Sequence, residues 1–205
     1  IPDINTMDPI MIQHALPRKL EDPPFRPYAR DEKLARPWAI PGTPGLMHRV
    51  GGLEKANITG NINYEADNHE LMVKLRAEKV AGIANFIPPQ KVNGPNQGEL
   101  LVVSWGGTQG ACHTAVQKAQ QQGISVAHCH LRHMNPFPAN LGEILASYDK
   151  ILVPELNMGQ LRMLLRDRFL VDAVGFNKVK GKPFAVSEVL ARIKEMTTAS
   201  GNGRH

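Results

Sequence analysis

Residues 99–110 read ELLVVSWGGTQG, a short apolar run that leads directly into a glycine-rich loop. Glu99–Trp105 is rich in leucine and valine, which is typical of a strand buried on both faces of a sheet. The loop Gly106–Gly110 comes next, and Ala111–Gln122 is expected to form a helix that Gly123 ends. A strand, a short loop and a helix in this order form the repeating unit of α/β proteins.

The same alternation continues downstream of this unit. The expected strands are Ile124–His130, Lys150–Pro154 and Val171–Val174, and the expected helices are Leu141–Tyr148, Met158–Phe169 and a last helix capped by Ser187 that runs to about Met196. Short loops between strands and helices favour parallel strands joined by right-handed crossovers. The predicted fold class is therefore α/β, with a mostly parallel sheet covered by helices over residues 99–196.

The sequence before this domain has a different character. Nine of the sixteen prolines precede position 50, and proline both removes a backbone donor and favours extended backbone. Residues 1–60 are therefore expected to form an extended arm that lies across another surface. Residues 61–98 are expected to hold a connecting helix, capped by Asn68 and ending near Ile83, and a linker. Residues 197–205 are expected to be a flexible tail.

Composition excludes several classes of protein. The net charge is +5, but the basic residues are scattered, so no nucleic-acid partner is expected. Two cysteines provide neither a disulfide framework nor a ligand set for an iron–sulfur cluster, and they fit a reducing, cytoplasmic location. No stretch of 18 apolar residues predicts a membrane span. The chain begins at Ile1 rather than Met, without a recognisable signal peptide, so we expect a piece of a longer polypeptide.

The first candidate site is the glycine loop, with Gly106, Gly107, Thr108 and Gly110. Glycines allow the backbone to approach a ligand, and the following helix offers free amides to an anion. The loop lacks the G-x-G-x-x-G spacing and the lysine of a phosphate-binding loop. A tight strand-to-helix turn is the alternative interpretation.

The second candidate is the run HCHLRH at residues 128–133. On a strand, His128 and His130 point to the same face, so a metal site with His133 is one hypothesis. No carboxylate and no C-x-x-C motif accompanies these histidines, so no metal is expected. The alternative is that Arg132 and His133 contact an interface or clamp a carboxylate or phosphate at the end of the strand.

The third candidate follows the strand Lys150–Pro154. Glu155 is a potential acid or base, although nothing nearby supplies a nucleophile. Glu155 and Asn157 would otherwise cap the next helix or meet another subunit. No catalytic triad or H-E-x-x-H motif is evident. We therefore assign no catalytic and no cofactor-binding residue, and we expect no resident metal or cofactor in this chain.

Several of these motifs, read in order, resemble one family. The chain is similar to alpha subunits of 2-oxoacid:ferredoxin oxidoreductases, particularly the 2-oxoglutarate type, downstream of their thiamine-pyrimidine domain. The stretches that carry the resemblance are 28–45 (YARDEKLARPWAIPGTPG), 48–54 (HRVGGLE), 68–83, 105–110 (WGGTQG), 128–138 (HCHLRHMNPFP), 153–161 (VPELNMGQL) and 174–184 (VGFNKVKGKPF). In this family serine is often expected where Gly107 stands, which places any polar contact there in doubt.

The resemblance implies an intact complex that converts a 2-oxoacid and coenzyme A to acyl-CoA, CO2 and reduced ferredoxin. Such a complex would use thiamine diphosphate, magnesium and an iron–sulfur cluster, with ligands mainly on a beta subunit, and would be oligomeric. Residues 99–196 would resemble the transketolase carboxyl-terminal domain, and residues 1–60 would include the end of the thiamine-pyrimidine domain. The chain would then be a non-catalytic interface portion, inactive by itself. The alternative is a stand-alone α/β module that binds an anionic ligand at Gly106–Gly110.

Overall fold

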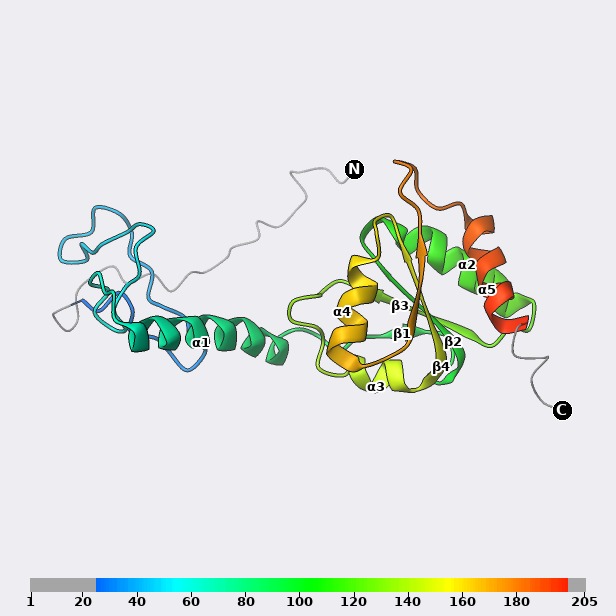
Figure 1. Ribbon diagram of the computed structural model, residues 1–205, viewed down its shortest axis with the longest axis horizontal. Helices are drawn as coiled ribbons and strands as arrows, with labels where there is room; N and C mark the ends of the chain where they lie inside the picture. Colours follow the sequence, from blue (N-terminus) through cyan, green and yellow to red (C-terminus); the bar gives the residue numbers. More distant parts are fainter. Residues whose placement is uncertain (1–24, 199–205) are drawn as a thin grey trace, which may run out of the picture. The chain divides into compact units, whose positions relative to one another are not determined.

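The computed structural model describes residues 25–198 of the chain (Figure 1). The chain divides into two compact units, Ile1–Gly82 and Ile83–His205. The first part of the expected arm, residues 1–24, and most of the expected tail, residues 199–205, lie outside the described residues.

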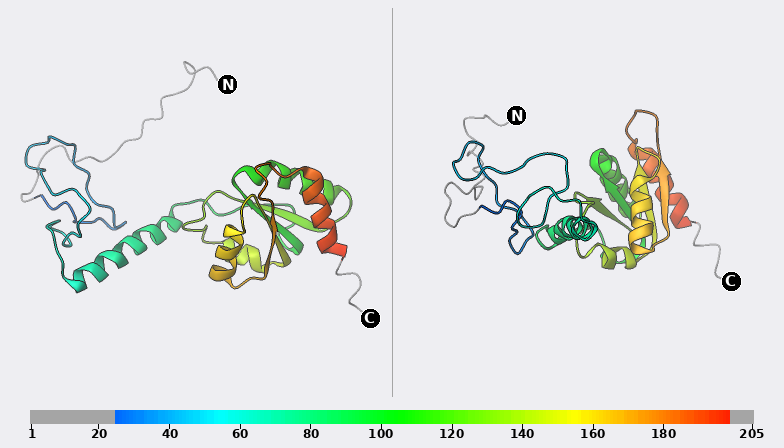
Figure 2. Two further views of the ribbon diagram at one scale, coloured as in Figure 1. Left: turned by 45° about the horizontal axis from the view of Figure 1, so that its top comes forward. Right: turned by 60° about the vertical axis from the view of Figure 1, so that its left-hand side comes forward.

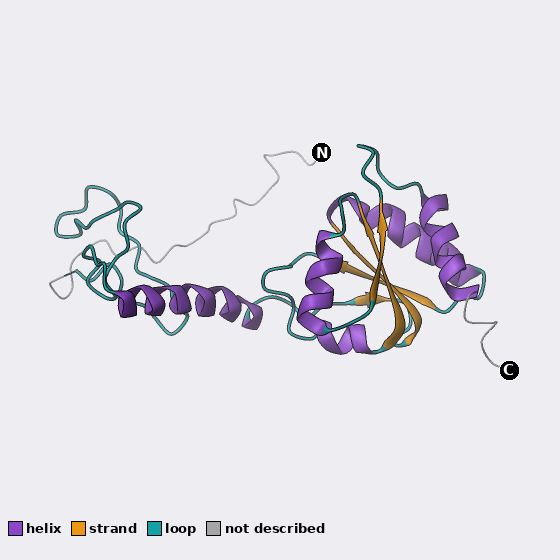
Figure 3. Cartoon of the chain, viewed as in Figure 1, coloured by secondary structure: helices purple, strands orange, loops and turns teal. Residues whose placement is uncertain are grey.

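The second unit is a three-layer α/β domain (Figure 3). Its elements in chain order are η2 (Ile83–Asn85), β1 (Val92–Asn93), β2 (Gly98–Trp105), η3 (Gly106–Thr108), α2 (Gln109–Gln121), β3 (Val126–Leu131), α3 (Leu141–Ala146), β4 (Tyr148–Glu155), α4 (Gln160–Phe169), β5 (Ala173–Asn177) and α5 (Val186–Thr198). The strand order is β1-β3-β2-β4-β5, and all pairs are parallel except β1 with β3. The predicted fold class is confirmed.

Alternating side chains of the central strands fill two apolar clusters, one on each face of the sheet. Leu101, Val103 and Val153 pack with residues of α3 and α4, whereas Leu100 and Val102 pack with residues of α2 and α5. The helices accordingly flank the sheet as two pairs, which can be followed from two further directions in Figure 2. Burial on both faces explains why β2 is a continuous apolar run rather than an alternating one.

Some expected boundaries of the sheet unit are wrong. Tyr148 was placed at the end of a helix, but it is buried and begins β4, where it pairs with Gly98. Ser187 was expected to cap the last helix but lies within it, and the Glu188 carboxylate accepts a hydrogen bond from the Ala185 N–H at 2.7 Å instead. The short antiparallel strand β1 was not predicted, because two residues carry too little pattern.

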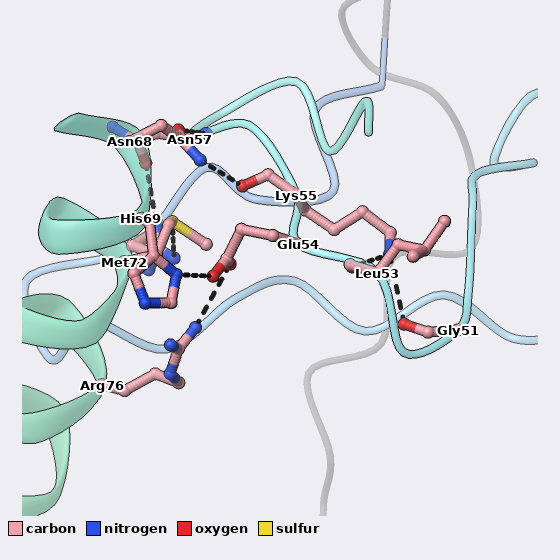
Figure 4. A network of polar contacts seen from close by, with 10 residues as sticks. Gly51, Leu53, Glu54, Lys55, Asn57, Asn68, His69, Met72 and Arg76 are labelled. Atoms are coloured by element: carbon pink, nitrogen blue, oxygen red, sulfur yellow. Dashed lines mark hydrogen bonds and ion pairs between the residues drawn. The ribbon is translucent and has the colours of Figure 1, made fainter. Parts of the chain in front are cut away.

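The described part of the first unit, residues 25–82, contains one helix, α1 (Ala66–Gly82). The segment before it, 25–65, holds isolated β-bridges such as Tyr28 with Ile58 but no helix or named strand. Asn68 was expected to cap α1 but lies inside it. Its side chain donates to the Lys55 carbonyl at 2.9 Å and accepts from the Asn57 N–H at 3.0 Å (Figure 4). Asn68 therefore holds the helix against the preceding segment.

A second set of polar contacts joins the same two segments. The Glu54 carboxylate accepts hydrogen bonds from His69 Nδ1 at 2.7 Å and from Arg76 Nη1 at 3.5 Å (Figure 4). Both donors belong to α1. The hydrogen bond from His69, with smaller contributions from Arg76, lowers the pKa of the Glu54 carboxyl below its ordinary value. In residues 25–198, no helix is long and apolar enough to cross a bilayer.

Candidate functional site at the carboxyl edge of the sheet

The loop residues among the predicted site residues follow the carboxyl ends of β2, β3 and β4, which are neighbouring parallel strands, while Glu155 is the last residue of β4, and His128 and His130 lie within β3. The chain leaves β2 toward β3 on one side and returns to β4 on the other, so a topological switch point lies between β2 and β4. Ligands of open α/β sheets bind at this kind of position. One hydrogen bond crosses it, from Trp105 Nε1 to Glu155 Oε1 at 3.2 Å.

The glycine loop is a single 3-10 turn that leads directly into α2. Gly106 adopts φ +54°, a left-handed conformation that favours glycine. Thr108 is buried, and its hydroxyl donates to the Trp105 carbonyl at 2.7 Å while accepting from the Trp105 N–H at 3.3 Å. The Thr108 hydroxyl is thus used to close the turn, an arrangement that matches a strand-to-helix connection.

Unlike Gly106, Gly107 and Gly110 have no left-handed backbone that would favour glycine, and a Cβ at either position would meet open space. Neither glycine is required by close packing within this chain. Gly110 lies in the first turn of α2 rather than in the loop.

Arg132 and His133 are exposed beyond the end of β3. Within residues 25–198, neither side chain has a hydrogen bond or an ion pair to another part of the chain. The Arg132 charge acts on His130: burial first, and then Arg132, lowers the pKa of the His130 imidazole. Arg132 and His133 are therefore available to an external acceptor.

Glu155 is fully buried, and its carboxylate is occupied by N–H donors. Oε1 accepts from Trp105, from Asn157 and from the Leu161 backbone N–H at 2.8 Å, and Oε2 accepts from the Arg162 backbone N–H at 3.1 Å. The last two are free amides of the first turn of α4, where a negative charge is stabilising. The role found for Glu155 is a helix cap rather than a solvent-facing acid or base.

Asn157 completes this cap from the β4–α4 loop. Its Oδ1 accepts from the Gly159 N–H at 2.7 Å and from the Gln160 N–H at 3.0 Å. Its carbonyl accepts from Asn177 Nδ2 at 2.9 Å, which ties the loop to the end of β5. Glu155 and Asn157 together satisfy four amides at the start of α4, leaving that helix end closed to an anion.

His128 and His130 do point to one face of the sheet, as the alternation of a strand predicts. They meet there at Ser104 of β2, whose Oγ lies 2.7 Å from His128 Nε2 and 2.8 Å from His130 Nδ1. His113 of α2 reaches the same place, with its ring centroid 5.7 Å from that of His128. Among residues 25–198, no hydrogen bond or ring contact joins His133 to these three histidines. The described residues contain no group of three or more histidines, cysteines or carboxylates that would hold a metal ion.

Sequence reasoning missed Ser104 and Trp105, which bridge the strands at this edge. Both belong to the apolar run of β2, and only the register that pairs Ser104 with His130 reveals the contact. The sequence signal that was available is the single hydroxyl residue in the apolar run 100–105.

The family described as "Pyruvate:ferredoxin oxidoreductase core domain II" matches residues 98–181, which run from β2 through β5 and leave out β1 and α5 of the sheet unit. The 2-oxoglutarate oxidoreductase subunit KorA of Mycobacterium tuberculosis is 51% identical over 191 residues, which is 92% of this chain and 28% of that protein. The chain belongs to the alpha-subunit family of 2-oxoacid:ferredoxin oxidoreductases. The resemblance stated from the motifs is thereby confirmed.

More distant members agree with this assignment. Subunit alpha of 2-oxoacid:ferredoxin oxidoreductase 2 from Aeropyrum pernix is 26% identical over 198 residues, covering 93% of this chain and 30% of that one. The solved structure of 2-oxoglutarate:ferredoxin oxidoreductase from Magnetococcus marinus, with 2-oxoglutarate, coenzyme A and succinyl-CoA bound, matches 85% of this chain and 31% of that chain. Its TM-score is 0.79 at 29% identity. The chain spans less than a third of the length of these relatives.

Proposed function

We propose that this chain is the non-catalytic interface portion of the alpha subunit of a 2-oxoglutarate:ferredoxin oxidoreductase. The observation that carries the proposal is the 51% identity to the M. tuberculosis 2-oxoglutarate oxidoreductase subunit over 92% of the chain, which spans both units. The intact enzyme would convert 2-oxoglutarate and coenzyme A to succinyl-CoA and CO2 and pass the electrons to ferredoxin. The M. marinus complex carries the corresponding substrate and product.

The chemistry of this chain supports a non-catalytic role. An iron–sulfur cluster needs several accessible thiolates, but the only cysteines are Cys112 and Cys129, which are buried in opposite clusters. Burial raises the pKa of each thiol to about 12, which disfavours the thiolate. These residues do not fit a cluster.

Thiamine diphosphate and magnesium do not fit the carboxyl edge of the sheet either. The buried carboxylate there, Glu155, already accepts four N–H donors, and the amides at the start of α4 are already capped. The Thr108 hydroxyl closes its own turn. We infer that other parts of the complex hold the cofactors, mainly the beta subunit. Within the described range 25–198, no specific contact favours the stand-alone anion-binding alternative.

The residues left for an interface are those that this chain does not use internally. Arg132 and His133 are exposed donors without partners among residues 25–198, and Gly106, Gly107 and Gly110 line a part of the edge that is open. A guanidinium pairs well with a carboxylate or phosphate in two parallel hydrogen bonds. We propose that this edge contacts the beta subunit, with Arg132 as its charged anchor.

The test is reconstitution of the full-length alpha subunit with its beta subunit, followed by dye reduction with 2-oxoglutarate or pyruvate. We expect turnover with 2-oxoglutarate and a much lower rate with pyruvate. Arg132→Gln should weaken association of the subunits at least tenfold, since it removes one charge-assisted contact. Arg168→Gln, an exposed arginine at the end of α4, is the control. Preference for pyruvate would overturn the substrate assignment, and unchanged association would overturn the role of Arg132.

A further inference from the structure

Three polar side chains lie together in the otherwise apolar layer between the sheet and the helices α2 and α5. Ser104 pairs in register with His130, and Val102 pairs with His128. Because side chains alternate along a strand, Ser104, His128 and His130 share the face of Leu100, Val102 and Val126, which pack on α2 and α5. His128 is 1% exposed, whereas His130 is partly exposed toward the carboxyl edge.

The distances define a chain of hydrogen bonds with one open end. Ser104 Oγ lies 2.7 Å from His128 Nε2 and 2.8 Å from His130 Nδ1. The remaining ring nitrogen of His128, Nδ1, is buried and has no hydrogen-bond partner among the residues that the structure describes. A buried polar atom without a partner is uncommon in native proteins and calls for an explanation.

Two arrangements of the hydrogens satisfy these distances. In the first, His128 Nε2–H donates to Ser104, and the Ser104 hydroxyl donates to His130 Nδ1. In the second, both bonds are reversed, and His128 then carries its hydrogen on the buried Nδ1. The first arrangement is favoured, because it leaves only a lone pair unpaired in the interior, whereas an unpaired buried N–H donor is the rarer and costlier defect.

We propose that His128, Ser104 and His130 form a directional hydrogen-bond relay that makes the packing of β3 against the start of α2 sensitive to acid. A proton taken up at Nδ1 of the half-buried His130 turns that atom from acceptor to donor. The Ser104 hydroxyl can then donate only to His128 Nε2, which requires His128 to release its Nε2 hydrogen to water and to take one from water at its buried Nδ1, with no change in its net charge. Protonation at the edge is thus transmitted into the interior, where the ring of His113 from α2 lies 5.7 Å away.

The charged and titratable groups that face the relay all lower the pKa values of its histidines. His113 on α2 and Arg132 beyond the end of β3 are both potential or permanent cations. Burial first, and then the charges of His130 and His113, lowers the pKa of His128 from 6.5 to about 4. Burial and then Arg132 lower the pKa of His130. Each added proton is therefore disfavoured by its surroundings in the folded chain.

The sign of the pH dependence follows from these lowered pKa values. Between the ordinary pKa of 6.5 and about 4, the unfolded chain binds a proton at His128 that the folded chain does not. The contribution of His128 to stability is complete above that window and is lost as the pH falls through it. The folding equilibrium constant should decrease about tenfold per pH unit for one such histidine.

The test uses the 205-residue chain labelled with ¹⁵N-histidine and long-range ¹H–¹⁵N spectra recorded from about pH 8 to about pH 4.5. At about pH 8, His128 should be neutral with its hydrogen on Nε2, and this hydrogen should be found on Nδ1 once His130 has become protonated. Ser104→Ala removes the bridge, so protonation of His130 no longer forces a reversal, and the titration midpoint of His130 should rise. His133→Gln, an exposed histidine outside the relay, should leave both signals unchanged.

Two results would overturn the relay. One is a His128 whose hydrogen is on Nδ1 at about pH 7.5. The other is a His130 midpoint that stays the same or falls in Ser104→Ala. If Ser104→Ala does not fold, the spectrum of the unaltered chain still decides the direction of the hydrogen bonds. Neither outcome depends on the proposed oxidoreductase function, because no turnover is measured.

Discussion

The sheet unit and the amino-terminal unit hold their elements in place by different means. The sheet unit buries two apolar clusters of 13 and 12 residues, one on each face of the sheet. In the described part of the first unit, Leu46 and Met72 are the buried large hydrophobic side chains, while Trp38, Met47, Val50 and Tyr64 are 63%, 90%, 88% and 80% exposed. Polar bonds from Asn68 and Glu54 join its helix to the rest.

This difference indicates which part of the chain is self-sufficient. Burial of apolar surface is the dominant stabilising term in folding, whereas exposed hydrogen bonds and ion pairs contribute little net free energy. The sheet unit should therefore unfold as one cooperative body. The first unit should unfold at a lower free energy than the sheet unit. This would suit a segment that gains its full stability by packing on another part of a larger subunit.

The largest expected effect comes from the sheet core. Leu152→Ala removes a fully buried side chain from β4, which lies between β2 and β5, and should lower the free energy of unfolding by about 3 kcal/mol. Urea unfolding followed by the fluorescence of Trp105 reports on this unit when Trp38, the other tryptophan of the chain, is replaced by phenylalanine in every variant. Leu164→Ala, the same substitution at a half-exposed position of α4, should change the free energy of unfolding by less than about 0.5 kcal/mol. Equal effects at both positions would contradict the assignment of the core.

An intermediate effect is expected at the cap of α4. Glu155→Gln replaces a buried acceptor with a group that must also place two N–H donors among Trp105, Leu161 and Arg162, so it should cost about 2 kcal/mol. Asp167→Asn, an acidic residue exposed on the same helix, is the matched control. Amide exchange should speed up at the start of α4 in Glu155→Gln only. An unaltered exchange pattern would show that the carboxylate does not hold the helix.

The smallest expected effect lies in the first unit. Asn68→Ala removes two hydrogen bonds at the start of α1 and should cost about 1 kcal/mol locally. The loss should appear as faster amide exchange in α1 without a change in the unfolding midpoint of the sheet unit. Asn63→Ala, which loses a single bond to the Glu65 N–H before the helix, should have a weaker effect. A shift of the sheet midpoint in Asn68→Ala would mean that the two units unfold together.

The same contrast explains how far the sequence could be interpreted. β2 and β4 were predictable because burial on both faces leaves an uninterrupted apolar run, as in Leu100–Val103. The caps at Asn68 and Ser187 were predicted wrongly, since capping residues are common in sequence and only tertiary contacts decide which one lies at the helix end. At Asn68, the contacts to Lys55 and Asn57 were decisive.

The candidate site was predictable in its position but only partly in its chemistry. Each loop was predicted separately to follow a strand, and the parallel sheet brings the loops at Gly106, Arg132 and Glu155 to one edge. The Glu155 carboxylate accepts hydrogen bonds from four N–H donors. This depends on tertiary structure, because the β4–α4 loop must fold back over its own strand. Likewise, the alternation of His128 and His130 predicted a shared face, whereas their meeting at Ser104 required the register between two strands.

Dye reduction by the isolated 205-residue chain tests the central claim most directly, measured beside the reconstituted complex. Both samples would receive 2-oxoglutarate, coenzyme A, thiamine diphosphate and magnesium. We predict turnover by the complex, none by the chain alone, and loss of turnover when the complex is assembled from an alpha subunit that lacks these residues. Turnover by the chain alone would contradict a non-catalytic role, and full turnover without these residues would contradict a role in the assembly.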